Sequence, residues 1–168
     1  MLDISVGIKR KFLVVYDHPN GEHWEDTFEN LTPDAALNTI LSIIYGTTAK
    51  SAAFYVGLIT GPGSGNTYAA GDTAASHAGW TEAVPYSNAN RVTATFPATA
   101  TSKSISNSGS PAVFNVNGSA TIAGCFLIDN NTKSGSSGNL MGEGNFSSGD
   151  KSVSSGGTLT VTVTATGS

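Results

Sequence analysis

Apolar and polar residues alternate along much of this chain, which is typical of β-strands with one buried face. Residues 8–17 have this character, and Asn20-Gly21 predicts a tight turn before a second strand returns through 24–28. Near the end, residues 158–166 alternate Leu, Val and Ala with Thr, which predicts one buried face and one wet face. Further short strands are predicted at 52–59, 92–96, 104–107, 113–116, 120–128 and 140–146.

One segment has helical spacing instead. Thr32 is the predicted N-cap, Pro33 the first helical residue, and Gly46 the residue that ends the helix. We expect the apolar stripe of this helix to pack against a sheet, and a groove on a partner is the alternative. The stripe consists of Leu37, Ile40, Leu41 and Ile44.

These elements predict a mainly β fold: an antiparallel, jelly-roll-like sandwich or barrel with one N-terminal α-helix. The 168 residues suffice for a single β domain, with a hairpin and the helix in 1–50 and the sandwich body in 51–168. Only 12% of the residues are charged and the net charge is -4, yet aromatic residues are spaced along the chain. This composition favours a folded chain over a disordered one.

Basic residues are few and dispersed, so neither a nucleic-acid surface nor a cofactor site is predicted. The run Lys9-Arg10-Lys11 lies in a predicted strand, where we expect a solvated edge, with contact to a partner as the alternative. The single cysteine, Cys125, lies in an apolar run and excludes an intrachain disulfide. Met1-Leu2-Asp3-Ile4 is unlike a signal peptide, and no stretch has membrane-spanning length, so we expect a soluble protein without a membrane partner.

The least generic stretch is 72–91, which begins Asp-Thr-Ala-Ala-Ser-His-Ala-Gly-Trp-Thr-Glu. A structural interpretation has Trp80 and Tyr86 covering one end of a β core, with Asp72 and Arg91 joined by a charge-assisted hydrogen bond. This interpretation is favoured because aromatic side chains more often serve burial than chemistry. In the functional alternative, a partner is contacted by His77, Trp80, Glu82, Tyr86 and Arg91.

Candidates for catalysis are scattered. Asp72, Ser76 and His77 have the residue types of a hydrolase triad, but Gly-x-Ser-x-Gly does not occur. A metal site at the first turn would use Asp17, His18, Glu22 and His23, whose spacing matches no standard pattern. Carboxylates for glycoside cleavage would have to come from Glu82, Asp129, Glu143 and Asp150, which lie on separate segments. The sequence thus favours a non-enzymatic protein that acts through its surface.

Several segments resemble, in the same order, a family of small structural proteins of tailed bacteriophages. The resemblance rests on residues 24–32, 54–59 and the His-Ala-Gly-Trp loop at 72–82, and it continues through 106–108, 112–114, 122–127 and 156–161. It implies a virion protein, most similar to a head decoration or cement protein. Such a protein is made in the host cytoplasm and binds outside the shell of the major capsid protein.

The resemblance also implies a mechanism, in which homodimers or homotrimers bridge neighbouring capsomers. Two alternatives stay open: a tail or fibre component that contacts host glycans through Trp80 and Tyr86, and a carbohydrate-active enzyme on a β scaffold. The predicted partner-binding residues are Trp80, Tyr86, Arg91, Lys9, Arg10 and Lys11.

Overall fold

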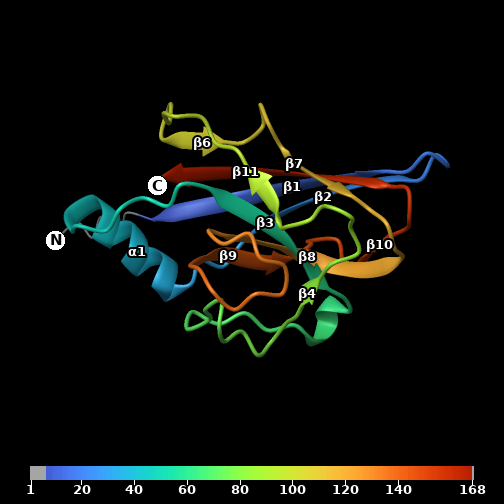
Figure 1. Cartoon of the computed structure of the whole chain (residues 1–168), viewed down its shortest axis with the longest axis horizontal. Helices are drawn as coiled ribbons and strands as arrows, with labels where there is room; N and C mark the ends of the chain where they lie inside the picture. The colour runs from blue at the N-terminus through green and yellow to red at the C-terminus, as the bar shows by residue number, and fades with distance from the viewer. Residues whose placement is uncertain (1–6, 168) are drawn as a thin grey trace.

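The computed structural model describes residues 7–167, which form a β-rich fold with one α-helix (Figure 1). The two longest strands, β1 (Ile8–Asp17) and β11 (Thr158–Gly167), pair antiparallel along their full length. The expectation about Met1-Leu2-Asp3-Ile4 falls outside the described residues. The other elements are β2 (His23–Glu29), α1 (Asp34–Tyr45), β3 (Phe54–Thr60), the 3-10 helix η1 (Gly63–Gly65), β4 (Glu82–Ala83), β5 (Val92–Ala94), β6 (Ser104–Ser106), β7 (Ala112–Asn115), β8 (Ala120–Ile128), β9 (Leu140–Asn145) and β10 (Lys151–Val153).

The strands form two antiparallel sheets. In sheet A the order is β2-β1-β11, and both β6 and β7 pair with the other edge of β11. In sheet B, β8 and β3 are central, with β9 and β10 beside β8 and with β4 and β5 beside β3. The prediction of a mainly β, antiparallel fold with one helix is confirmed.

The main core lies between the sheets, where the alternating pattern places it. Phe12, Val14 and Tyr16 of β1 face inward beside Leu159 and Val161 of β11, and all are fully buried. The threonines between them are only partly buried on the other face of the sheet. Sheet B contributes side chains of the same kind from its inner face, among them Val56, Leu58, Ile122, Cys125 and Leu127.

Strand β8 is buried on both faces, which explains its continuous apolar run. Cys125 and Leu127 belong to the main core, whereas Phe126 and Ile128 belong to a second cluster on the outer face of sheet B. Cys125 is fully buried, and burial raises the pKa of its thiol. It fills space as a small apolar side chain, as expected.

Helix α1 begins and packs differently from the prediction. Pro33, rather than Thr32, is the N-cap residue, and Thr32 instead accepts a hydrogen bond from Arg10. Gly46 does follow the last helical residue. The stripe packs only in part, since Ile40 lies against the core while Leu37, Leu41 and Ile44 are exposed. Neither α1 nor any other helix within residues 7–167 combines the length and apolar character needed to cross a membrane.

Candidate functional site

The stretch singled out in the sequence lies on the outer face of sheet B. We call residues 66–82 the covering loop, because Tyr68, Ala74 and Trp80 pack there against Phe126 and Ile128 of β8. Trp80 is only 5% exposed and its ring centroid lies 5.0 Å from that of Phe126. The geometry agrees with the structural interpretation of Trp80, although the side chain covers a sheet face rather than one end of the core.

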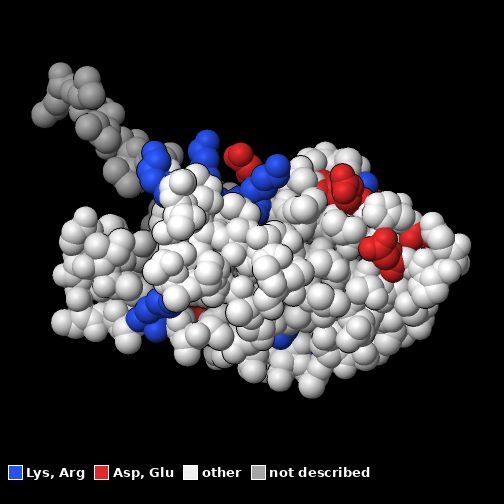
Figure 2. Space-filling model, turned by 90° about the horizontal axis from the view of Figure 1, so that it is seen from above, with Lys and Arg blue, Asp and Glu red and all other residues white. Residues whose placement is uncertain are grey.

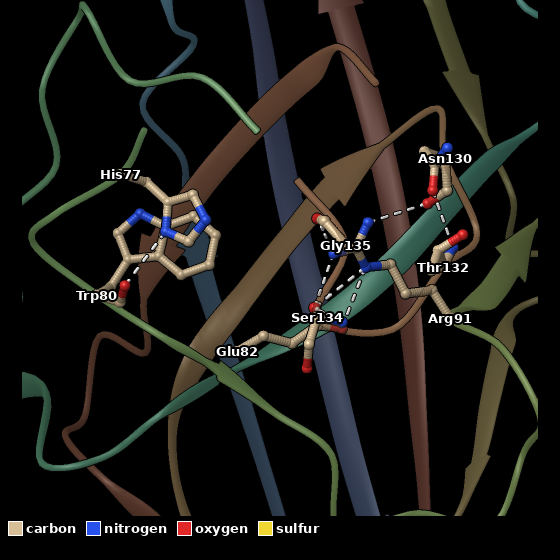
Figure 3. A network of polar contacts seen from close by, with 8 residues as sticks. All are labelled: His77, Trp80, Glu82, Arg91, Asn130, Thr132, Ser134 and Gly135. Carbon is tan, nitrogen blue, oxygen red and sulfur yellow. Dashed lines mark hydrogen bonds and ion pairs between the residues drawn. The ribbon is translucent and has the colours of Figure 1, made fainter. Parts of the chain in front are cut away.

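The indole of Trp80 is held on both sides. The His77 ring stacks on it with centroids 3.9 Å apart, and His77 Nδ1 lies 3.2 Å from the Trp80 carbonyl oxygen (Figure 3). The indole N–H is also held, since Trp80 Nε1 donates a 2.6 Å hydrogen bond to Glu143 Oε2 on β9. The indole is therefore sandwiched between the loop's own histidine and the sheet, with no free ring face for a ligand.

Glu143 is a fully buried carboxyl group. Burial, together with the nearby carboxyl group of Asp72, raises the pKa of Glu143 to about 8, and the Trp80 hydrogen bond only partly opposes this rise. Glu143 Oε1 accepts no hydrogen bond within the described residues. A proton on Oε1 would give Glu143 a donor to offer to Asp72, and the raised pKa favours that protonated form.

Arg91 forms a buried ion pair with Glu82, not with Asp72 as the sequence analysis expected. Arg91 Nη2 lies 2.7 Å from Glu82 Oε2 and Nε donates to both carboxylate oxygens, with both side chains at most 5% exposed. Asp72 instead accepts from the backbone N–H of Ala69 and lies near Glu143. The expected pairing was wrong because Asp72 and Arg91 lie at opposite ends of a long loop, where sequence gives no distance.

The remaining donors of Arg91 bind backbone. Nη1 donates to the Asn130 carbonyl and Nη2 to that of Gly135, while Glu82 also accepts from the Ser134 N–H (Figure 3). The guanidinium thus joins the segment before β5 to the 129–139 loop, with its centre 5.1 Å from the Phe126 ring centroid. All its polar groups are used internally, which is the geometry of a structural tie.

Tyr86 is also buried, at 2% exposed, and packs edge-on against Phe114 in the main core. Lys133 lies over its other face, 4.1 Å from the ring centroid, and donates to the Tyr86 carbonyl. Burial raises the pKa of the Tyr86 hydroxyl. The side chain plugs the core and offers no exposed ring for sugar stacking.

The basic run of β1 is divided by strand alternation. Lys9 and Lys11 are exposed on the outer face of the sheet, but β1 pairs with β11 along its whole length and with β2 from Lys11 onward, so the predicted edge strand is wrong. Arg10 points the other way and is only 5% exposed, so the expectation of an exposed edge is wrong for this residue. The alternation that buries Phe12 buries Arg10 as well, because the two side chains share one face of the strand.

The residue types of catalytic sites do not converge within the described residues. No hydrogen bond in residues 7–167 joins Asp72, Ser76 and His77 to one another. His23 pairs with Asp17 at 2.8 Å on the surface. Within residues 7–167, no group of three His, Cys, Asp or Glu side chains could hold a metal ion. Among the carboxylates, Asp129 accepts from Ser51 and Asn139, and Asp150 accepts from Gly63. Each of these two carboxylates is thus occupied by hydrogen bonds that include a donor from a distant segment.

Two features escaped the sequence analysis. Asp26 on β2 accepts hydrogen bonds from Ser147 and Ser148 after β9, and so joins the two sheets. Its place in the alternating pattern at 24–28 indicated burial but not a partner. The second feature is a cavity between the sheets, which Arg10 lines. A charged residue at an inward position of a strand was the available signal for it.

No protein-family model matches this chain, and no curated protein matches it. The resemblance to phage virion proteins therefore remains a prediction from the sequence.

Proposed function

We propose that this protein is a non-enzymatic virion component that binds the outside of a tailed-phage capsid and stabilises contacts between capsomers. The proposal includes a jelly-roll relationship for the two sheets and homodimers or homotrimers that bridge neighbouring units. It rests on the sequence resemblance and on one surface of the molecule. That surface is the exposed face of α1.

The exposed face of α1 consists of Leu37, Leu41, Ile44 and Tyr45, which are 39%, 54%, 62% and 83% exposed. Large apolar side chains that are exposed together on one face are often functional. Residues 35–49 contain no charge. An uncharged apolar helix face in water favours a protein partner whose surface is also apolar.

The face of the molecule shown in Figure 2 also supports a protein that acts by attachment. Charged side chains are sparse on the face shown in Figure 2, and large areas carry none. Repeated copies on a symmetric shell would turn weak single contacts into strong collective binding. The buried rings of Trp80 and Tyr86 do not favour the glycan-binding alternative, which needs exposed ring faces.

The first test is the copy number of this chain in purified particles, measured against the major capsid protein. A ratio near one, or a simple symmetric fraction of it, is expected. A few copies per particle would move the protein to the tail or a vertex, and absence from particles would remove it from the virion.

The second test places the contact on α1. Particles lacking the protein are mixed with purified wild-type chain, Leu41→Asp or Ser42→Asp, and bound protein is quantified after sedimentation. We expect Leu41→Asp to bind at least roughly tenfold less, because a buried unpaired charge disrupts an apolar interface. Ser42 is also exposed on α1 and adds the same charge beside the apolar face, so Ser42→Asp should bind normally. Equal binding of both variants would exclude α1 as the contact.

A further inference from the structure

A cavity of about 490 Å³ lies between the two sheets. Its walls come from both sheets, with Phe54 and Leu127 on one side and Ile105 and Val163 on the other, and Ile40 of α1 is part of the lining. We call it the intersheet pocket. Its volume lies within the range of roughly 300–1,000 Å³ that small-molecule sites occupy.

The charges on the walls of this pocket have one sign. Arg10 and Lys50 line it, and none of the described residues on its walls is Asp or Glu. Arg10 belongs to the inward face of β1, opposite Ala165 of β11, and is 5% exposed. A cation has thus been placed where the strand pattern calls for an apolar side chain.

Arg10 lacks a counter-ion within the part of the chain that the structure describes. Its Nη1 donates a 2.9 Å hydrogen bond to Thr32 Oγ1, and within residues 7–167 it forms no ion pair. Burial without a compensating anion lowers the pKa of Arg10 to about 10. The contrast with Arg91 is informative, because that equally buried guanidinium meets a carboxylate and two backbone carbonyls. A buried charge normally requires such partners, and Arg10 has one neutral hydroxyl.

We propose that the intersheet pocket binds a small anionic amphiphile, with the carboxylate on the Arg10 guanidinium and an apolar tail between the sheets. A carboxylate matches the planar fork of an arginine and would supply the missing negative charge. The tail would rest on Phe54, Leu127 and Val163. This inference is independent of attachment to a capsid, since the pocket lies between the two sheets and not on the exposed face of α1.

The test uses the full chain and two probes of equal length, decanoate and decanol. Calorimetric titration below about 1 mM, well under the range where such chains aggregate, should show saturable one-to-one binding of decanoate, roughly 10- to 100-fold tighter than that of decanol. In methyl NMR spectra, decanoate should shift Ile40 and Ile105, which line the pocket, but not Ile59 in the second cluster. The spectral readout needs no variant and so does not depend on refolding.

A matched pair of variants then isolates the charge. Arg10→Met should reduce decanoate affinity to that of decanol while leaving thermal stability unchanged or raised, because an apolar side chain suits this site. Lys9→Met removes the same charge from the outer face of the same strand and should keep wild-type binding. A purely structural Arg10 would instead give a less stable Arg10→Met protein and no preference for decanoate.

Three results would overturn the proposal. These are equal affinity for both probes, shifts at Ile59 instead of Ile40 and Ile105, or no response to decanoate while an acidic peptide binds. The last result would mean that the pocket binds an acidic segment of a protein partner instead of a small amphiphile.

Discussion

Glu143 carries an energetic cost that depends on its protonation. The side chain is fully buried beneath Trp80, close to Asp72, and its Oε1 lacks a hydrogen-bond donor within the described residues. As an anion it would repel Asp72 in a medium that solvates charge poorly. Its pKa is raised to about 8 because the neutral acid avoids, first, the cost of a buried charge and, second, this repulsion. The covering loop is therefore held best when Glu143 is protonated.

This cost predicts an unusual pH dependence. The folded pKa of Glu143 lies above that of a free carboxyl, so the stabilisation is complete below about pH 4.5 and is lost as the pH rises through about 8. Glu143→Gln keeps an oxygen acceptor for Trp80 and removes the charge. We expect urea unfolding to show Glu143→Gln more stable than wild type at pH 8.5, by several kcal/mol at most, with a smaller difference near pH 5.

Asp129 provides the control for this prediction. Burial tends to raise its pKa, but hydrogen bonds from Asn139 and Ser51 outweigh burial and leave the pKa lowered. Asp129→Asn should therefore destabilise the protein at neutral pH, in the direction opposite to Glu143→Gln. If Glu143→Gln were less stable than wild type across the whole pH range, Glu143 would instead stabilise the fold as an ionised carboxylate.

Sequence reasoning reached some of these residues and not others. The burial of Trp80 and Tyr86 followed from their size and their position in an otherwise polar loop. The partner of Arg91 did not follow, since Asp72 and Glu82 are equally plausible from sequence and only the fold brings Glu82 within 2.7 Å. The sequence does not distinguish Glu143 from the three other candidate carboxylates, because nothing in residues 140–146 indicates that both faces of β9 are covered.

At the scale of elements, glycines allow β8 and β9 to approach closely. A Cβ added to Gly124 would lie 1.9 Å from the carbonyl oxygen of Gly144, which is backbone and cannot rotate away. At Gly57 on β3 the obstacle is a side chain, since an added Cβ would lie 2.1 Å from the ring of Phe126. These glycines in strand interiors thus serve close approach, for which only a residue without a side chain fits.

Gly124→Ala should therefore destabilise the pairing of β8 with β9. We expect the free energy of unfolding to fall by roughly 3 kcal/mol, because the backbone of one strand must move away from the other. Gly109→Ala is the matched control, since nothing lies within 4 Å of a Cβ added there. Urea denaturation of both variants measures the difference. Equal stability of the two would mean that β9 shifts without cost.

Strong alternation made some elements predictable. The strands at 8–17 and 120–128 were predicted with the bounds that β1 and β8 have, and β11 extends one residue beyond its predicted end. The short strands β4 and β10 were missed, since two or three residues carry no recognisable period. The packing of α1 was predicted only in part, because a sequence stripe shows that a face is apolar but not what covers it.

At the scale of the whole molecule, the two sheets are joined by polar contacts along their sides. Leu31 and Glu143 exchange backbone hydrogen bonds on one side, where Asp26 of β2 also reaches Ser147 and Ser148 after β9. On the other side, Tyr86 bridges to Val116. The intersheet pocket is lined by residues of both sheets, and its walls are apolar apart from Arg10, Lys50 and three hydroxyl side chains.

Asp26→Asn tests whether the first of these ties supports the whole fold. Burial tends to raise the pKa of Asp26, but hydrogen bonds from Ser148 and Ser147 lower it below the usual value. Its stabilisation is thus present at neutral pH and lost as the pH falls through the folded pKa. We expect Asp26→Asn to cost about 2 kcal/mol at pH 7, since hydrogen bonds to an anion are replaced by weaker neutral ones. The cost should disappear in acid, once the pH falls below the folded pKa of Asp26.

The matched control is Asp17→Asn, because Asp17 pairs with His23 on the surface with a side chain that is 67% exposed. That substitution should change the unfolding free energy by less than about 0.5 kcal/mol. If Asp26→Asn proved as harmless as Asp17→Asn, the sheets would be held together by their apolar core alone. If Asp26→Asn lowered the free energy of unfolding at pH 7 but not in acid, the ionised carboxylate of Asp26 would be what holds this side of the two sheets together. The apolar core side chains do not titrate and could not cause such a pH dependence.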